Sequence, residues 1–395
     1  MSIPTEPIGR IPWPKALHTP KKKLHDRIEH LIEHFLSLAN VAIDGRRPWD
    51  IHVHNDNFYH TVLKYGSIGL GESYMVGWWD APQVDEFVCR VLKADLPQKF
   101  ISVQDYLCYL QALLLNQQCP KRSYVNVEKH YDIGNDLYKC MLDKRMIYSC
   151  AFWENASTLD EAQEAKLDMV CRKLELKPGM RVLDIGCGWG GMVQFAAQNY
   201  GVEILGITIS KEQVALARQC CEGLPVEIRL QDYRSLNESF DRILSLGMFE
   251  HVGYKNYRTF MEKVRSLLKE DGLFLLHTIG SNLSQKTIDS WIHKYIFPNA
   301  MLPSARQISA ALEGLFVLED WHIFGADYDK TLMHWYDNFQ SNRHTLKKKY
   351  DDRFFRMWKY YLLSCAGSFR ARSNQLWQIV LSPRGIPGGY RAHYK

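Results

Sequence analysis

From residue 181 onward, segments with the apolar pattern of strands alternate with segments that have the apolar spacing of helices. Short apolar runs that are typical of buried strands occupy 181–185, 203–207, 226–230, 240–246, 272–277, 315–321 and 376–382. Between them, apolar residues spaced three and four apart indicate amphipathic helices at 191–199, 210–221, 255–268 and 304–313. This alternation predicts an α/β fold with a mostly parallel seven-stranded sheet and helices on both faces.

The residues before 120 follow another pattern and predict a smaller α+β domain. Apolar residues at helical spacing predict helices at 24–39, 84–94 and 101–115, whereas the aromatic- and glycine-rich stretch 50–80 favours strands and turns. Polar residues and a proline near 117–123 indicate a connection between domains. The expected boundaries are an N-terminal domain at 1–116, a linker at 117–127 and a larger domain at 128–395.

One apolar segment interrupts the strand–helix alternation. Residues 282–303 follow a predicted strand and include Trp291, Tyr295 and Phe297. Ligands of open α/β sheets bind at the carboxyl ends of the strands, so this insertion is a candidate lid over an apolar substrate. A second small core is an equally good interpretation.

A glycine-rich turn, DIGCGWGG, follows the first strand of the larger domain at 184–191. Glycines let the backbone turn sharply and lie against a ligand, and the next helix offers free N–H groups at its start. An acid precedes the first glycine by two residues, and Thr208 stands where the dinucleotide fingerprint has an acid. The turn indicates a nucleotide-type ligand, although a tight structural connection has a similar sequence.

The composition is typical of a globular protein without disulfide bonds. It has 395 residues, of which 46% are apolar, so it can bury a sizeable core. Its ten cysteines include no C-x-x-C pair, which favours reduced thiols and a cytoplasmic location. Residues 1–23 lack the apolar centre of a secretory signal, and no run of eighteen apolar residues predicts a membrane span.

The net charge of +5 is concentrated near the end of the chain. Residues 341–395 carry 12 basic and 2 acidic residues, a balance of +10, whereas residues 1–120 carry 12 and 13, a balance of −1. The basic residues alternate with aromatic ones, which suits an anionic membrane surface or a nucleic acid. The alternative is an amphipathic helix that packs on the domain and keeps its charges in water.

Sequence segments along nearly the whole chain resemble cyclopropane-fatty-acyl-phospholipid synthases, which belong with the mycolic acid cyclopropane synthases among S-adenosylmethionine-dependent methyltransferases. The segments, in chain order, are GLGESYMVGWW (69–79), EKHYDIGNDLY (128–138), MIYSCAFW (146–153), VLDIGCGWGG (182–191), GITIS (206–210), LQDYR (230–234), MFEHVG (248–253), LLHTIGS (275–281), KYIFPN (294–299), FGADYD (324–329) and CAGSFR (365–370). Their joint occurrence in this order is far more specific than the glycine turn alone.

The resemblance implies a fold, an activity and partners. The fold would be a Rossmann-like class I methyltransferase domain, preceded by a lipid- or membrane-associated domain. The activity would be transfer of a methylene group from S-adenosylmethionine to the cis double bond of an acyl chain in a membrane phospholipid, with bicarbonate as the base. The family also favours a homodimer bound peripherally to the inner face of the membrane. No nucleic acid partner and no metal are expected.

Strand-end placement and the family pattern together select residues for the S-adenosylmethionine site. They are Tyr148, Ser149, Asp184, Gly186, Gly188, Gly191, Thr208, Ser210, Gln213, Gln231 and Asp232.

The chemistry that the family implies requires a dry site with a base. Methyl transfer to an alkene leaves a cation in the acyl chain, which water would trap and which aromatic faces can stabilise. A base must then remove a proton so that the ring closes. Glu250, His277 and Tyr328 each lie at or after a different predicted strand end, and are expected to converge on one crevice.

Three further residues enter the candidate site through the resemblance. Cys150 and the backbone near Ile279 match family positions that hold bicarbonate together with Glu250, His277 and Tyr328. Cys365 lies in the CAGSFR segment, where a thiol nucleophile has been proposed in the family. An apolar setting would raise its pKa and favours a packing role instead.

Three other functions remain open from the residues. The basic C-terminal segment would suit a nucleic acid methyltransferase, but no RNA-binding module is recognisable and residues 1–120 are not basic. A lipid-binding protein without catalysis would not need the cofactor pattern. A third possibility is the same fold making a methyl-branched or hydroxylated lipid, which depends on how the cation is quenched.

Overall fold

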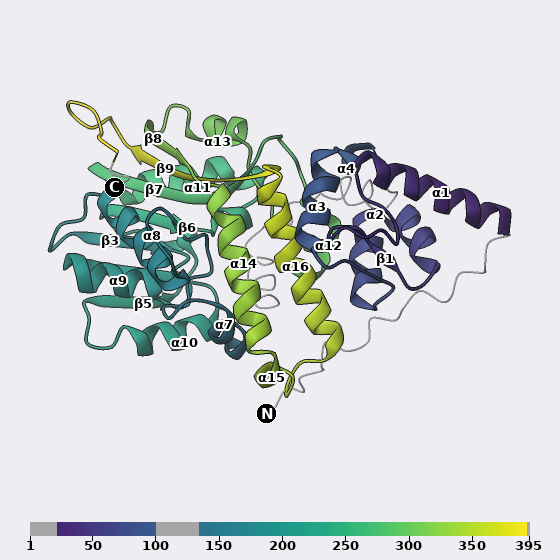
Figure 1. Cartoon of the computed structure of the whole chain (residues 1–395). Helices are drawn as coiled ribbons and strands as arrows, with labels where there is room; N and C mark the ends of the chain where they lie inside the picture. Colours follow the sequence, from purple (N-terminus) through teal and green to yellow (C-terminus); the bar gives the residue numbers. More distant parts are fainter. Residues whose placement is uncertain (1–21, 100–133, 393–395) are drawn as a thin grey trace.

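The computed structural model describes residues 22–99 and 134–392, and Figure 1 shows a sheet domain and a smaller helical part on either side of two long helices. The strands of the seven-stranded sheet are β3 (Arg181–Ile185), β4 (Glu203–Thr208), β5 (Val226–Leu230), β6 (Phe240–Leu246), β7 (Leu268–Ser281), β8 (Val317–Ile323) and β9 (Asn374–Ser382). Their order is β5-β4-β3-β6-β7-β9-β8, and only β9 runs antiparallel to its two neighbours. The predicted mostly parallel seven-stranded sheet is confirmed.

Helices cover both faces of the sheet, as the alternation predicts. One apolar core packs α8 (Leu159–Lys173), α9 (Gly191–Tyr200) and α10 (Lys211–Cys220) on one face. A second core packs α11 (Tyr257–Leu267) and α13 (Ala305–Leu312) on the other. The short 3-10 helices are η1 (Tyr233–Ser235), η2 (Phe249–His251) and η3 (Tyr254–Asn256). Strands such as β3 are buried on both faces, which explains their continuous apolar runs.

The N-terminal part is mostly helical. Its elements are α1 (Lys22–Leu38), β1 (His52–Val53), α2 (Asn57–Met75), β2 (Trp79–Asp80), α3 (Val84–Lys93) and α4 (Leu96–Lys99). Helices α1 and α3 confirm two predictions, whereas the helix expected at 101–115 and the linker at 117–127 lie outside the described residues. Within those residues, no helix has the length and apolar character needed to cross a bilayer.

The prediction of strands and turns over 50–80 is wrong for most of that stretch, because α2 occupies 57–75. Two of its glycines, Gly69 and Gly71, are places of close approach. A Cβ on Gly71 would lie 2.3 Å from the Trp291 ring, and one on Gly69 would lie 2.2 Å from the Thr61 carbonyl oxygen. Gly66, with a φ of 56°, kinks the helix.

Helices near the end of the chain join the two parts. They are α14 (Ala326–Ser341) and α16 (Asp352–Arg370), and Figure 1 shows both between the sheet and the N-terminal helices. Two short helices, α7 (Asn135–Met141) and α15 (Arg343–Leu346), contact α14. Helix α16 packs against α14 on one side and against α2 and α3 on the other. One apolar core therefore includes side chains from both parts of the chain.

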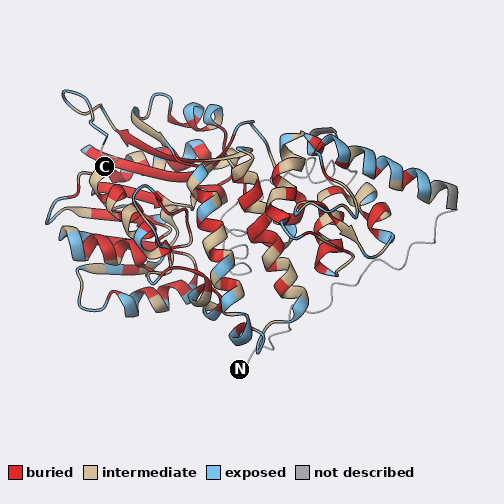
Figure 2. Ribbon diagram, in the orientation of Figure 1, coloured by how far each residue is buried: buried red, intermediate tan, exposed pale blue. Residues whose placement is uncertain are grey.

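Residues 352–370 of the basic, aromatic C-terminal segment form this packed helix, so the packing expected in the amphipathic-helix alternative is confirmed, whereas its charges do not all lie in water. Phe355, Trp358 and Tyr361 of α16 are buried, and Figure 2 shows the middle of α16 as mainly buried. Two of its arginines are engaged within the fold. Arg356 donates to the Tyr74 carbonyl oxygen at 2.5 Å, and Arg370 pairs with Asp85 and Asp329.

The candidate lid at 282–303 contains α12 (Ser290–Tyr295). Trp291, only 1% exposed, belongs to the core shared with the N-terminal helices, and Met301, also 1% exposed, belongs to the sheet core. The segment therefore extends two large cores and does not build one of its own. Pro298 and Asn299, near its end, border the pocket described next.

Candidate active site

The glycine turn after β3 takes a backbone conformation that favours glycine. Gly186, Gly188 and Gly190 have φ values of 93°, 55° and 91°, and α9 begins directly after them. A Cβ on Gly188 would meet no atom within 4 Å, whereas one on Gly186 would lie 2.8 Å from Met248. The turn thus leaves an open space above Gly188, at the carboxyl edge of the sheet.

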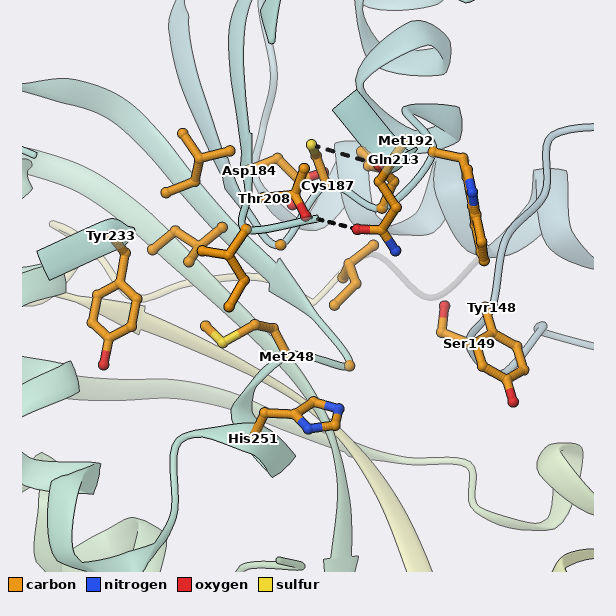
Figure 3. Close-up of a pocket in the computed structure, with 18 of the residues that line it drawn as sticks. Tyr148, Ser149, Asp184, Cys187, Met192, Thr208, Gln213, Tyr233, Met248 and His251 are labelled. Carbon is orange, nitrogen blue, oxygen red and sulfur yellow. Dashed lines mark hydrogen bonds between the residues drawn. The ribbon is translucent and has the colours of Figure 1, made fainter. Parts of the chain in front are cut away.

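A pocket opens over this turn (Figure 3). Its lining includes all but one of the residues predicted for the cofactor: Tyr148, Ser149, Asp184, Gly186, Gly188, Gly191, Thr208, Gln213, Gln231 and Asp232. Figure 3 places Tyr148 and Ser149 on one side of the pocket and Tyr233 on the other, with Met248 and His251 between them. The predicted residues therefore come together, although they are spread over more than eighty positions of sequence.

Ser210, the exception, lies behind the lining. It is the N-cap of α10 and its hydroxyl accepts a hydrogen bond from the Gln213 N–H. The Thr208 hydroxyl donates to Gln213 Oε1 at 2.7 Å. Ser210 thus fixes the helix start, and Thr208 leaves the Gln213 amide NH2 available to a ligand.

Two acids line the pocket. Asp184 is 1% exposed, and burial raises the pKa of its carboxyl to about 7, although the nearby Lys166 charge opposes that shift. Its Oδ1 has no hydrogen-bond partner among the described residues. Asp232 is instead held by Arg234, whose guanidinium lies 2.5 Å from Oδ2. Asp184 is therefore the acid that could accept a donor from a ligand.

Glu250 occupies a closed position after β6. The Ile279 N–H donates to its Oε1 at 2.7 Å, while Oε2 has no hydrogen-bond partner among the described residues. Burial raises the pKa of Glu250 to about 7, partly offset by the Ile279 hydrogen bond. A carboxyl with such a pKa can exchange a proton near neutral pH.

His277 lies inside β7 and not at its end, so the predicted strand end at residue 277 is wrong. The strand continues to Ser281 because β9 pairs with it as far as Asn374. The Gln378 amide lies 3.2 Å from His277 Nδ1, and the Phe324 ring lies 5.9 Å from the imidazole. Burial lowers the pKa of His277 well below its usual value, which keeps the ring neutral.

Tyr328 is the residue around which other candidates gather. It is buried near the start of α14, and the groups whose charges would raise its pKa include Cys150, Glu250 and Cys365. Burial raises the pKa of Tyr328 well above its usual value, so its hydroxyl remains a donor. No hydrogen bond joins His277 to Glu250 or Tyr328 within the described part of the chain.

Both candidate cysteines are protonated thiols. Cys150 is fully buried and donates to the Ala151 carbonyl oxygen at 3.2 Å, and burial raises its pKa well above the usual value. Burial raises the pKa of Cys365 to about 12. A thiol with that pKa is a poor nucleophile at neutral pH, which favours the packing role for Cys365.

Aromatic rings connect the pocket to the buried cluster. The Trp335 ring centroid lies 5.2 Å from that of Tyr148, which borders the pocket, and 5.9 Å from that of Tyr328. Phe297 lies 6.1 Å from His251 and 5.8 Å from Tyr361. The wall between the two groups of candidate residues is therefore made of aromatic rings in contact with one another.

Sequence reasoning missed several of these residues. Trp335 and Tyr361 lie on α14 and α16, two helices that are not among the predicted ones, and His251 lines the pocket although it is not among the predicted site residues. Burial lowers the pKa of His251 to about 4, so its imidazole is neutral. Asn299 can be recognised as a site residue only in the structure. It lines the pocket and has an unusual positive φ of 61°.

Known proteins resemble this chain in sequence. The family model described as mycolic acid cyclopropane synthetase matches residues 118–379. The chain is 53% identical to the cyclopropane-fatty-acyl-phospholipid synthase of Escherichia coli K12 over 370 residues, which cover 93% of this chain and 96% of that protein.

Solved structures agree. The cyclopropane synthase MmaA2 of Mycobacterium tuberculosis aligns with a TM-score of 0.62 at 31% identity, covering 65% of this chain and 97% of that one. The mycolic acid cyclopropane synthase CmaA1, solved with SAH and CTAB, aligns with a TM-score of 0.61 at 32% identity and the same coverage. These proteins are class I methyltransferases, and the predicted fold class is confirmed.

Proposed function

The chain belongs to the mycolic acid cyclopropane synthetase family and is an S-adenosylmethionine-dependent methyltransferase, and from this premise we propose that it cyclopropanates the acyl chains of membrane phospholipids. It would transfer a methylene group to the cis double bond of an unsaturated acyl chain. The observation that carries the proposal is the group of aromatic rings between a cofactor pocket and the buried Glu250 carboxyl, because an alkene cation requires protection from water and a base.

The pocket fits S-adenosylmethionine. The space above Gly188 admits a ligand against the backbone, and the Asp184 carboxyl, which lines the pocket, would accept from an ammonium group. The cofactor would supply the electrophilic methyl group. Tyr148, Gln213 and the turn would orient it, which is where most of the rate acceleration for a weak nucleophile must arise.

The aromatic wall would protect the acyl cation. Tyr148, Trp335 and Phe297 exclude water, and their ring faces can stabilise positive charge. Water excluded from this site cannot trap the cation as an alcohol. The same residues therefore favour ring closure over hydroxylation.

The base belongs to the cluster around Tyr328. Bicarbonate would supply a small basic anion there, held by Glu250, Tyr328, His277, Cys150 and the backbone near Ile279. The Tyr328 hydroxyl is a donor, and the unpartnered Glu250 Oε2 with its raised pKa can hold a proton between itself and an anion. Glu250, fixed by the Ile279 N–H, is thus an orienting group and not the direct proton acceptor.

The N-terminal part would meet the lipid. Leu31 and Leu38 of α1 are 40% and 49% exposed, and residues of this kind can enter a bilayer surface. We place residues 1–116 at the inner face of the membrane as a peripheral domain, and the enzyme as a homodimer, on family resemblance. Binding to phosphatidylethanolamine vesicles on flotation, lost in Leu31→Glu with Leu38→Glu, tests the membrane contact.

A product assay tests the function. Purified protein, S-adenosylmethionine and vesicles of cis-unsaturated phosphatidylethanolamine should yield acyl chains with one added carbon and cyclopropyl protons by NMR. Vesicles with saturated acyl chains are the control and should give no product. A methyl-branched or hydroxylated product would replace the proposed reaction by another quenching of the cation, and no lipid product would exclude the function.

A further inference from the structure

A buried lysine stands directly behind the cofactor pocket. Lys166 of α8 is 0% exposed, and its Nζ donates to the Ser149 hydroxyl oxygen at 2.9 Å. This is the one hydrogen bond of the ammonium within residues 22–99 and 134–392. A buried ammonium is costly, so a position that keeps one needs an explanation.

The hydrogen bond sets the polarity of Ser149. An ammonium has donors only, so the Ser149 oxygen is the acceptor and its own O–H proton is free to point elsewhere. Ser149 lines the pocket, and α8 also holds its carbonyl oxygen through the Gln163 amide at 2.9 Å. The hydroxyl therefore presents a donor, with a positive charge behind it, to a ligand acceptor.

The same ammonium interacts with the pocket acid. The negative charges of Asp143 and Asp184 both favour the ammonium form of Lys166. Burial lowers the pKa of Lys166 to about 8, so it remains mostly charged at neutral pH. The pocket thus offers a donor at Ser149, with the Lys166 charge behind it, and an acceptor at Asp184. The donor matches the carboxylate of an amino acid and the acceptor matches its ammonium group.

We propose that Lys166 is a positioning residue that fixes Ser149 as the hydrogen-bond donor to the carboxylate of the cofactor's amino acid portion. The inference rests on the proposed use of S-adenosylmethionine. Lys166 would then contribute to the binding of the amino acid portion of the cofactor and not to the binding of its nucleoside portion.

Helix α8 provides a matched control two turns further along. Lys173 is also 0% exposed, and it contacts His322 at 3.0 Å and Asp320 at 3.7 Å, away from the pocket lining. Burial lowers its pKa to about 8 as well. Lys173→Met therefore removes an equally buried charge from the same helix without touching Ser149.

The experiment measures the affinities of two ligands by calorimetry. S-adenosylhomocysteine has the amino acid portion, and 5′-methylthioadenosine lacks it. In Lys166→Met the affinity for the first should fall by about tenfold to a hundredfold, as for loss of a charge-assisted hydrogen bond, while the affinity for the second stays native. Lys173→Met should bind both ligands as the native protein does.

A second variant keeps the test decisive if Lys166→Met does not fold. Lys166→Gln also removes the ammonium while keeping a polar side chain, and it should show the same selective loss. Ser149→Ala removes the donor itself, and its combination with Lys166→Gln should lose no more than Ser149→Ala alone. Equal losses for both ligands, or no loss for S-adenosylhomocysteine, would overturn the inference. Failure of the native protein to bind either ligand would instead refute the proposed use of the cofactor.

Discussion

The hydroxyl oxygens of Tyr148 and Tyr361 lie 2.8 Å apart, so a hydrogen bond ties the pocket rim to the middle of α16. Tyr361 is 3% exposed, and α16 also packs on α2 and α3. The cofactor pocket is therefore linked, through one hydrogen bond and one helix, to the N-terminal helices.

Removing one of these hydroxyls should loosen the pocket rim. We expect Tyr361→Phe to keep its ring packing, to lose about 1 kcal/mol of stability, and to reduce turnover on lipid vesicles several-fold. Tyr360→Phe is the control, because Tyr360 is equally buried but packs on Trp291 and Tyr74, away from the pocket. Native turnover in Tyr361→Phe, measured beside thermal unfolding, would contradict this.

The open space above Gly188 predicts a selective loss of cofactor binding. Gly188→Val would strain a backbone with a φ of 55° and fill the space that a ligand needs. Gly179→Val carries similar strain, since Gly179 has a φ of 80° and equally open surroundings, but it lies outside the pocket. Calorimetry should show binding of S-adenosylhomocysteine lost in the first variant only; equal affinities in both would count against the assignment.

Glu250 should matter for turnover and not for cofactor affinity. We expect Glu250→Gln to keep the hydrogen bond from the Ile279 N–H through its amide oxygen, and to lower turnover by about a hundredfold or more. Bicarbonate-depleted buffer should slow the native enzyme reversibly. A near-native rate for the variant, with full native activity in bicarbonate-free buffer, would remove the proposed base.

The same substitution should stabilise the protein above neutral pH. The pKa of Glu250 is about 7 in the fold, above its usual 4.5, so the folded state binds this proton more tightly than the unfolded state. Its stabilising effect is complete below about pH 4.5 and is lost as the pH rises to about 7. Glu250→Gln lacks this loss, so its stability relative to native should rise over that window by up to about 3 kcal/mol, as urea titrations at several pH values would reveal. A constant difference would contradict the buried ionisation.

Helix α16 approaches α3 so closely that Gly367 has no room for a side chain. A Cβ there would lie 2.3 Å from the Asp85 carbonyl oxygen. We expect Gly367→Ala to destabilise the protein by about 1–3 kcal/mol, even though alanine favours helices over glycine. Ser364→Ala, half-buried on the same helix, should cost less. Thermal unfolding distinguishes the two, and a stabilised Gly367→Ala would disprove the close contact.

The sheet and the cofactor turn could be predicted because their signals are local. Apolar runs identify strands buried on both faces, and glycines at positive φ identify the turn that follows β3. Helix α2 was mispredicted because Gly69 and Gly71 look like turn residues, while their purpose is contact with Thr61 and Trp291. Trp291 lies 220 positions away from Gly71, so no local sequence pattern can reveal this contact.

The candidate site was predictable only in part for the same reason. Tyr148, Asp184 and Thr208 lie next to strand ends or in family segments, and the structure brings them to one pocket. The ring of Trp335 gains its place only when α14 docks against the sheet domain. Lys166 gives no sequence signal, because its burial depends on how α8 packs beneath Ser149.

The apolar core shared by residues 28–96 and 355–369 has a consequence for synthesis of the protein. The N-terminal helices leave the ribosome first, yet α16, which covers them, is among the last segments made. Contacts between residues so far apart in the sequence form slowly, and the apolar surface that α16 covers on the N-terminal helices stays exposed until they form. Trp79, whose ring contacts Phe87 within the N-terminal part and Tyr360 of α16, therefore completes its packing only after α16 has been made.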